Sequence, residues 1–316
     1  MEKIGSWKRS RYREIKFETE RGRIFMELRV LRYFIEVARE GSITGAARTL
    51  HISQPTLSKQ LKELEAELGC KLFVRGNYNV RLTEEGILLR KRAEDILDMT
   101  DRTIEEFQSL NDVTGGEVRI GCAESELIHH LAGAIKDSRL QYPGLRFHIT
   151  SGDTRVVVND LEQGLSDFAV IVEPPDLTRY NYLSLPGGDT WGLLMRTDNP
   201  LAQKTEIWPQ DLKGVPLISS PQSLRVDLPR WCGEAVDQLN MVGTVNLFYN
   251  GSVFVKEGLG CLLVFDRLTD VGPESGLCFR PLTPKLETKM YIIWKKYQVF
   301  SPIAERLVEF LKERFS

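Results

Sequence analysis

Polar side chains with the chemistry to recognise nucleic acid cluster between positions 54 and 62. They comprise one amide, two hydroxyls and two amines: Gln54, Thr56, Ser58, Lys59 and Lys62. Amide and hydroxyl groups form hydrogen bonds with base edges in the DNA major groove, and lysines bind phosphates. A helix that presents such groups at its N-terminus and buries its other face suits insertion into that groove. A capped surface helix would show the same local pattern, so the flanking elements must distinguish the two interpretations.

The helix that carries these residues has a recognisable start, apolar stripe and end. Ser53 is a favourable N-cap, and Pro55 lies in the first turn, where its missing N–H costs nothing. Gly69 ends the run. Between them, apolar residues recur at helical spacing: Leu57, Leu61, Leu64 and Leu68. The pattern predicts a helix over 53–68 whose polar first turn faces solvent.

Two shorter helices are predicted before it, and a hairpin after it. The first helix has the apolar stripe Leu28, Leu31, Phe34, Ile35 and Ala38 and stops at Gly41. Ser42 can cap the second, whose apolar side is Ile43, Ala46, Ala47 and Leu50. The short link 51–53 and the small residues at 45–47 allow the close crossing of a helix-turn-helix. Residues 71–75 and 79–82 are predicted to form two strands joined by a Gly76-Asn77 turn, the wing of a winged helix. An irregular surface loop is the alternative for this hairpin.

With these residues in place, the segment from 26 to about 86 resembles the DNA-binding domain of the LysR-type transcriptional regulators. The matching text is Leu31-Arg32-Tyr33-Phe34, Gly41-Ser42-Ile43, Ala46-Ala47, Leu50, Ser53-Gln54-Pro55, Leu64-Glu65, Leu68-Gly69, Leu72-Phe73-Val74-Arg75 and Leu82-Thr83-Glu84-Glu85-Gly86. The chain departs from the family pattern at Ile43, where Phe is usual, and at Gly45, which costs about 1 kcal/mol relative to Ala inside a helix.

The resemblance implies a sequence-specific DNA-binding regulator, and the residues that would contact double-stranded DNA follow from the helix and the wing. Those expected at base edges are Gln54, Pro55, Thr56 and Ser58, beside the cap Ser53. Those expected at phosphates are Thr44, Lys59 and Lys62. Arg75 and Arg81, on the wing, are expected at the adjacent backbone or minor groove.

Composition is consistent with this interpretation. The chain has 316 residues, enough for two or three domains, and 42% hydrophobic content is ordinary for a globular protein. The net charge of -2 is unevenly distributed, because residues 1–25 carry +4, residues 26–84 carry +2 and the rest carries -8. A contact with a polyanion is therefore expected in the N-terminal part.

Several classes of protein are disfavoured. The chain shows no secretory leader and no apolar run near the ~20 residues that span a bilayer, so we expect a cytoplasmic protein without membrane contact. The cysteines are widely spaced and are interpreted as free thiols, either buried small hydrophobes or a redox sensor: Cys70, Cys122, Cys232, Cys261 and Cys278. His129 and His130 are adjacent on a predicted helix and would point in different directions, so no metal and no cofactor are expected.

The segments outside the winged helix are assigned from their own patterns. Residues 1–25 are either a DNA-contacting arm or, as we favour, an extension upstream of a true start at Met26. Residues 85–113 contain a long amphipathic helix with the seam Leu89, Ala93, Ile96, Thr100, Ile104, Phe107 and Leu110. That seam could pair two chains or pack on its own domain. The family resemblance favours a linker that makes a homodimer or homotetramer, and a dimer implies dyad-related half-sites. Asp112–Gly116 is the expected hinge.

Residues 114–316 alternate strand and helix signals, which predicts an α/β domain with a parallel sheet and helices on both faces. They resemble the two-lobed effector-binding domain of the same family, similar to periplasmic binding proteins. The motifs that carry this weaker match are Val118-Arg119-Ile120-Gly121, Asn199-Pro200-Leu201-Ala202 and Gly258-Leu259-Gly260. Lobe 1 is expected over about 117–187 and 283–316, and lobe 2 over about 188–282.

Loops after successive strands are candidates for binding a small-molecule effector between the lobes. The expected effector-binding residues are Glu124, Ser125, Ser151, Asp153, Thr154, Ser219, Ser220, Gln222 and Asn250, the last in the predicted loop Tyr249–Ser252. Each could equally be an ordinary helix cap. Because Glu124 and Asp153 would repel an anion, the effector could instead be a polar or cationic molecule. No enzyme motif is present, so no enzyme is expected. The alternative function is a constitutive DNA-binding protein without an effector.

Overall fold

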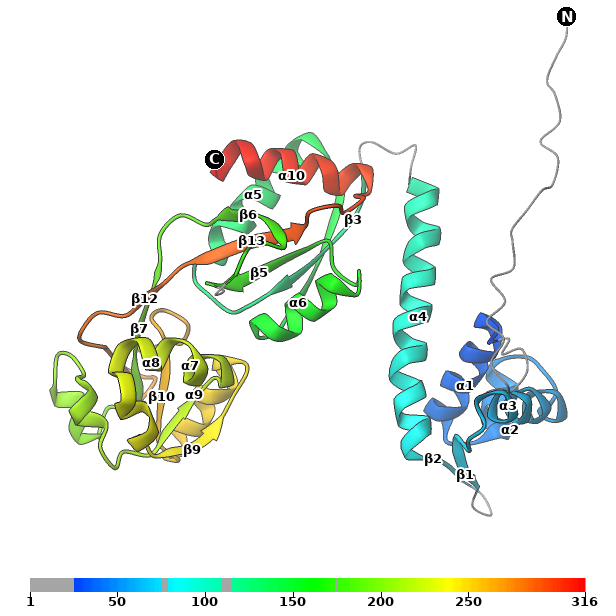
Figure 1. Ribbon diagram of the computed structural model, residues 1–316, viewed down its shortest axis with the longest axis horizontal. Coiled ribbons are helices and arrows are strands. Elements are labelled where there is room, and N and C mark those ends of the chain that lie inside the picture. Colours follow the sequence, from blue (N-terminus) through cyan, green and yellow to red (C-terminus); the bar gives the residue numbers. More distant parts are fainter. Residues whose placement is uncertain (1–25, 76–78, 110–114, 174–175, 316) are drawn as a thin grey trace, which may run out of the picture. The chain divides into compact units, whose positions relative to one another are not determined.

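The computed structural model describes residues 26–75, 79–109, 115–173 and 176–315 (Figure 1). The predictions for residues 1–25, for the Gly76-Asn77 turn and for hinge residues 112–114 lie outside these ranges. Gly115 and Gly116, which were predicted to belong to the hinge, instead begin a strand of the second unit. The chain forms two compact units, Met1–Asp101 and Arg102–Ser316, and each is considered by itself.

The first unit is a winged helix-turn-helix, as predicted. Its elements are α1 (Leu28–Glu40), α2 (Ile43–Thr49), α3 (Gln54–Leu68), β1 (Phe73–Arg75) and β2 (Val80–Leu82). Ser42 and Ser53 cap α2 and α3, because their side chains accept hydrogen bonds from the backbone N–H groups of Gly45 and Thr56. Strands β1 and β2 pair antiparallel with Phe73 opposite Leu82, so the predicted hairpin forms.

The long helix α4 (Glu84–Ser109) starts against the wing. Thr83 Oγ1 donates to Lys71 O at 2.7 Å and accepts from Gly86 N at 3.0 Å. A side chain on Gly86 would place its Cβ 2.2 Å from the Leu72 carbonyl oxygen, so only glycine fits this approach. The seam residues Leu89, Ala93 and Ile96 pack into the core of the winged helix. This half of the seam therefore packs on its own domain.

The first sheet of the second unit has the strand order β4-β3-β5-β13-β6. Its elements are β3 (Gly115–Cys122), α5 (Ile128–Gln141), β4 (Gly144–Ser151), α6 (Thr154–Glu162), β5 (Phe168–Val172), β6 (Tyr180–Ser184), β13 (Met290–Lys295) and α10 (Pro302–Phe315). Strand β3 is parallel to β4 and β5, whereas β13 is antiparallel to β5 and β6. The expected parallel sheet is thus mixed, because β13 returns from the second sheet and runs opposite to β5.

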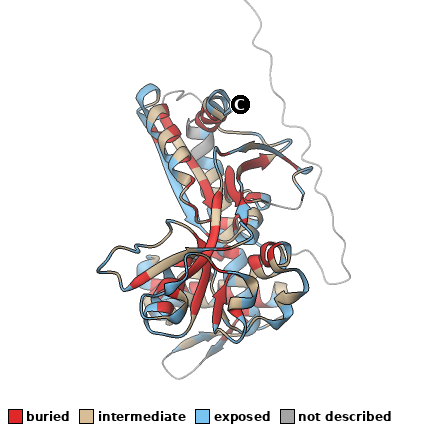
Figure 2. Cartoon of the chain, turned by 90° about the vertical axis from the view of Figure 1, so that its left-hand side faces the viewer, coloured by how far each residue is buried: buried red, intermediate tan, exposed pale blue. Residues whose placement is uncertain are grey.

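The second sheet has the order β11-β7-β10-β8-β9, with β12 beside β7. Its elements are β7 (Asp189–Arg196), β8 (Leu217–Ser219), α7 (Pro221–Arg225), α8 (Asp227–Cys232), β9 (Met241–Thr244), α9 (Phe248–Lys256), β10 (Cys261–Phe265), β11 (Leu277–Pro281) and β12 (Glu287–Thr288). Single-turn and two-turn 3-10 helices lie at Pro200–Gln203, Pro209–Leu212 and Gly233–Gln238. All five residues of β5 and of β10 are buried, as expected of strands covered on both faces (Figure 2). The chain passes between the two sheets after Ser184 and again before Met290.

Candidate nucleic-acid interface and interlobe cleft

The first turn of α3 presents its polar side chains to solvent. Gln54, Pro55 and Thr56 are exposed, whereas Leu57 and Leu61 are fully buried in the core of the winged helix. Ser53 Oγ lies 2.7 Å from Thr56 Oγ1, so these two hydroxyls also interact with each other. The helix therefore offers an amide and a hydroxyl pair at its open N-terminus, where its dipole favours a phosphate.

Other side chains that are predicted to contact DNA lie outside this first turn. Lys59, Lys62 and Arg81 are exposed, and Thr44 at the start of α2 is exposed too. Lys59 lies 3.7 Å from Glu63, and because this ion pair is exposed it contributes little to stability. Ser58 is half-buried. The backbone of Arg75 pairs with Val80 in the wing.

Glu65 joins the recognition helix to the wing from the buried side. Its carboxylate accepts from the backbone N–H of Leu72 at 2.9 Å and of Phe73 at 3.4 Å, and Lys71 Nζ lies 3.0 Å away. Burial by itself raises the pKa of Glu65, but these donors outweigh burial and leave the pKa below 4.5. The ionised carboxylate therefore holds the first residues of the wing against α3.

An interlobe cleft lies where strands of both sheets end. Five of the sequence-predicted residues line it, three from the first lobe and two from the second: Glu124, Asp153, Thr154, Ser220 and Gln222. The cavity holds about 30 Å³, close to the space of a single water molecule. Side chains therefore nearly fill the cleft in this state.

Glu124 connects the two lobes across this cleft. Its carboxylate, which follows β3 in the first lobe, accepts a hydrogen bond from the backbone N–H of Phe248, the first residue of α9 in the second lobe. Leu247, the N-cap residue of α9, has no side-chain cap. Glu124 thus caps a helix of the opposite lobe, a role compatible with the negative charge it brings to the positive end of that helix.

Two further carboxyl groups give the cleft region an acidic character. Asp227 lines the cleft and is 2% exposed, and burial raises its pKa to about 6. Asp189 is fully buried, accepts from Ser125 Oγ at 2.5 Å, and has a pKa of about 6 because of burial. Together with Glu124 and Asp153, these groups disfavour an anion in the cleft.

Two buried donors in the cleft have unused hydrogen-bonding capacity. Among the described residues, Trp191 Nε1 and Thr154 Oγ1 have no hydrogen-bond partner, and both residues line the cleft. An unsatisfied buried polar group costs roughly 1–3 kcal/mol, which a bound molecule with an acceptor would recover.

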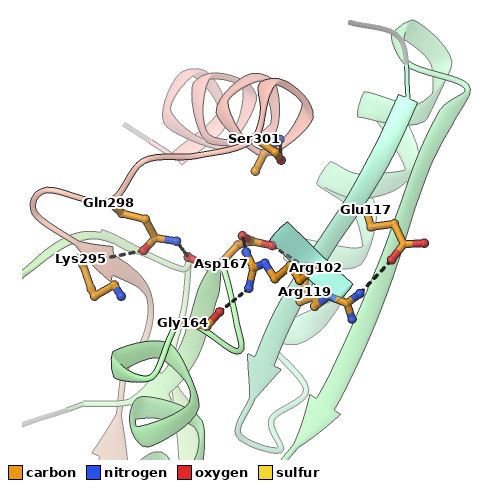
Figure 3. Close-up of polar contacts among 9 residues, drawn as sticks. Arg102, Glu117, Arg119, Gly164, Asp167, Lys295, Gln298 and Ser301 are labelled. Atoms are coloured by element: carbon orange, nitrogen blue, oxygen red, sulfur yellow. Dashed lines mark hydrogen bonds and ion pairs between the residues drawn. The ribbon is translucent and has the colours of Figure 1, made fainter. Parts of the chain in front are cut away.

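The last turns of α4 are tied to the first lobe by a buried ion pair (Figure 3). Arg102 donates to Gly164 O at 2.6 Å and pairs with Asp167, whose side chain is 3% exposed. Asp167 Oδ2 also accepts from Arg119 N at 2.8 Å. These contacts anchor Arg102 within the second unit.

Comparison with known proteins now decides the family. Residues 28–87 match the bacterial regulatory helix-turn-helix protein, lysR family, and residues 111–316 match the LysR substrate binding domain. The chain belongs to the LysR family of transcriptional regulators. It is a DNA-binding transcriptional regulator with a substrate-binding domain, and the family resemblance of the sequence is confirmed.

Relatives of this LysR-type regulator span most of its length. It is 28% identical to the HTH-type transcriptional regulator YtlI of Bacillus subtilis, over 81% of this chain and 83% of that protein. It is 27% identical to the Hca operon transcriptional activator HcaR of Escherichia coli, over 92% and 99%. The crystal structure of CbnR, a LysR family regulator, superposes with a TM-score of 0.69 at 20% identity, over 92% of this chain and 100% of that chain. At 20% identity, the similarity to CbnR shows a shared fold.

Some sequence-predicted effector residues do not line the cleft. Ser125 is buried and bound to Asp189, and Ser219 Oγ lies 2.6 Å from Ser223 Oγ within the fold. Ser151 is exposed at the end of β4. The prediction that Tyr249–Ser252 is a loop is wrong, since these residues are in α9, and Asn250 is exposed there.

Residues that the sequence analysis missed complete the cleft. They are chiefly Trp191, Asp227, Asn246 and Phe248. Asn246 lies in the loop between β9 and α9, a few residues before the predicted loop 249–252. The start of α9 was hard to predict from the local sequence, because its N-cap residue Leu247 has no capping side chain. The cap comes instead from Glu124, which is distant in the sequence.

The histidine prediction also needs correction. The rings of His129 and His130 lie 3.9 Å apart, so they do not point in different directions. Both are in the first turn of α5, where His129 Nδ1 turns back to Glu126 O at 2.7 Å. Within the described residues, no group of three metal-ligating side chains was found. No helix of the described ranges has the length and apolarity to cross a bilayer.

Proposed function

We propose that this regulator reads its operator with Gln54, Thr56 and Ser58 of α3, while Lys59 and Lys62 hold phosphates. Ser53, Pro55 and Thr44 shape and flank this contact, and Arg75 and Arg81 reach the neighbouring backbone or minor groove. The observation that carries the proposal is the exposed polar first turn of α3 above its fully buried leucines. A likeness in fold to full-length CbnR complexed with its target DNA, at a TM-score of 0.68, is consistent with it.

Substitutions in α3 separate base reading from phosphate binding. Gln54→Ala should relax specificity at one base position, because a bidentate amide contact discriminates bases by about 1–3 kcal/mol. Lys62→Ala should weaken binding to all sequences alike and reduce the salt slope by about 1. Fluorescence anisotropy with the operator and with random duplexes, over a range of salt concentrations, measures both. Equal losses of Gln54→Ala on cognate and random DNA would refute its base-reading role.

The proposed regulator is a homodimer or homotetramer that uses α4 to pair chains. Apolar side chains remain exposed at both ends of this helix: Ile87 and Leu88 near the start, Ile104 and Phe107 near the end. Exposed apolar residues of this size on one helix favour a partner chain. A symmetric dimer would then place two reading helices on dyad-related half-sites.

The proposed signal is a small polar or cationic effector bound in the interlobe cleft. The acidic lining and the unpartnered donors Trp191 Nε1 and Thr154 Oγ1 support a molecule that brings both acceptors and neutral or positive charge. The small present volume requires the lobes to separate on binding. Arg102 would pass that movement to α4.

The constitutive alternative is favoured by one observation, the nearly filled cleft. A thermal-shift screen of neutral and cationic metabolites distinguishes the two functions. An effector at about 100 times its dissociation constant adds about 2.7 kcal/mol to the free energy of unfolding. A hit that also changes operator affinity supports effector control, whereas a screen without any such hit supports constitutive binding.

A further inference from the structure

The chain passes between the two lobes of the second unit twice, and the two crossings run side by side (Figure 1). The first ends at Asp189, where β7 begins, and the second starts at Thr288, where β12 ends, and these two residues are paired in the antiparallel register. Gly187, in the first crossing, has a φ of 90°, which other residues rarely adopt. A rotation of one lobe against the other must bend the backbone at these crossings, residues 185–188 and 289, here called the interlobe hinge.

Asp189 brings a fully buried carboxyl group to the interlobe hinge. Its Oδ2 accepts a hydrogen bond from Ser125 Oγ at 2.5 Å, and because Ser125 follows β3, this bond joins the hinge to the first lobe. Among the residues that the structure describes, Oδ1 has no hydrogen-bond partner. Two more carboxylates lie near Asp189: Glu126, in the β3–α5 connection, and Asp266, directly after β10. The nearby Arg267 is already paired with Asp266 at 3.2 Å, so an ionised Asp189 would be buried near like charges.

Asp227 brings a second buried carboxyl group to the same hinge. Its Oδ1 accepts at 3.5 Å from Thr288 Oγ1, at the start of the second crossing. The guanidinium of Arg230 lies 4.0 Å from Asp227, but it also lies 3.8 Å from Glu173, which follows β5 in the first lobe. The arginine is therefore shared between carboxylates of the two lobes and does not neutralise Asp227 alone.

Carboxylates outnumber the arginines that face these two groups. The charged residues that face Asp189 or Asp227, or line the cleft beside them, are the carboxylates Glu124, Glu126, Asp153, Glu173 and Asp266 and the arginines Arg230 and Arg267. Burial first, and then the charge of neighbouring carboxylates, raises the pKa of Asp189 and of Asp227 to about 6. Both groups therefore bind a proton more tightly in this closed arrangement of the lobes than an exposed carboxyl group does.

Separation of the lobes would return these groups to water. Asp227 lines the cleft, and Asp189 would lose the hydrogen bond from Ser125 of the first lobe. Each pKa would then fall toward 3.8, the value of an exposed carboxyl group. The closed arrangement therefore binds the extra protons, so its population rises as pH falls through about 6 and falls as pH rises. A carboxyl group whose pKa differs by about two units between the two arrangements biases their equilibrium by up to about 100-fold.

We propose that Asp189 and Asp227 form a proton-operated switch at the interlobe hinge. With both carboxyl groups protonated the lobes stay closed, because no charge is buried between them. Release of the two protons to water leaves two buried carboxylates near others of the same charge, and their repulsion and hydration favour separation of the lobes. The switch operates without an effector and without DNA, so it goes beyond the function proposed above.

The test measures the distance between the lobes of the full-length regulator at several pH values. Nitroxide labels on non-natural amino acids replace Arg155 of α6 and Arg225 of α7, which are exposed and line one cavity from opposite lobes. Double electron–electron resonance is recorded on labelled chains diluted with unlabelled chains, so that only distances within one chain contribute. The distance should lengthen as pH rises from 5 to 8 through about 6.

The double variant Asp189→Asn, Asp227→Asn mimics the protonated state and should keep the short distance throughout. Each single substitution should reduce the change, which keeps the test decisive if the double variant does not fold. Asp237→Asn, at an exposed position of the same lobe, should behave as the parent. The proposal is overturned by a parent distance that does not change with pH, by a change that persists undiminished in the asparagine variants, or by its loss in Asp237→Asn. Base reading by α3 and the effector screen are measured separately, so their failure and the failure of this switch are distinguishable.

Discussion

Asp227 links the electrostatics of the cleft to stability at the scale of a single residue. Its carboxyl group is buried beside Thr288 Oγ1, which donates at 3.5 Å, and Arg230, whose guanidinium lies 4.0 Å away. Neither contact offsets burial, which raises the pKa to about 6. At neutral pH the folded protein therefore buries an ionised carboxylate, and a neutral side chain at this position would cost less free energy.

Asp227→Asn should therefore stabilise the protein at neutral pH. Between the unfolded pKa of 3.8 and the folded value of about 6, the folded state binds the extra proton, so the free energy of unfolding falls as pH rises through this window. Asparagine mimics the protonated form and should add about 3 kcal/mol at pH 8, with the gain vanishing near pH 4. Thermal unfolding across this pH range measures the effect.

Asp237→Asn is the matched control, because Asp237 is exposed in the same lobe. It should give the same melting temperature as the parent at both ends of the range. A gain for Asp227→Asn that stays constant with pH would contradict the proposed cause.

At the scale of elements, the recognition helix and the wing depend on one buried carboxylate. Glu65→Ala should leave the N–H groups of Leu72 and Phe73 without their acceptor, at a cost of about 1–3 kcal/mol. Hydrogen–deuterium exchange should then be faster across 71–82. Because the folded pKa is lowered, the contribution of Glu65 is complete above pH 4.5 and is lost as pH falls through the folded value.

Glu63→Ala provides the comparison on the same helix. Glu63 is half-exposed and interacts only with its α3 neighbours Lys59 and Gln60 among the described residues, so its removal should leave exchange of the wing unchanged. If both variants accelerated exchange alike, the wing would not depend on Glu65.

At the scale of the whole molecule, α4 should determine the assembly. Leu88→Lys should weaken the dimer about 100-fold, because each of two symmetric copies loses about 1.5 kcal/mol of apolar burial. Sedimentation velocity over a range of concentrations measures this. Val242→Lys changes a comparably exposed side chain in the second sheet and should leave the dimer intact. An unchanged dimer in Leu88→Lys would exclude this end of α4 from the interface.

Much of the winged helix was predictable because its signals are local. Ser42 and Ser53 cap their helices from within, and the leucine stripe of α3 is buried as its spacing requires. Strands β6 and β9 give weaker local signals, because each is short and most of its residues are partly or fully exposed. The apolar seam of α4 did not show whether the helix packs on its own domain or pairs with a second chain, because the same spacing is expected in both cases.

The sequence by itself determined the reading head of this regulator, the order of its lobes and five residues of its cleft. Those features rest on caps, periodicity and strand ends, which act over a few residues. Only the tertiary structure decided that Asn246 rather than Asn250 reaches the cleft, because α9 takes its cap from Glu124 across the lobes. It also brought Arg155 and Arg225 to one cavity, since residues 70 positions apart meet only when two lobes fold against each other.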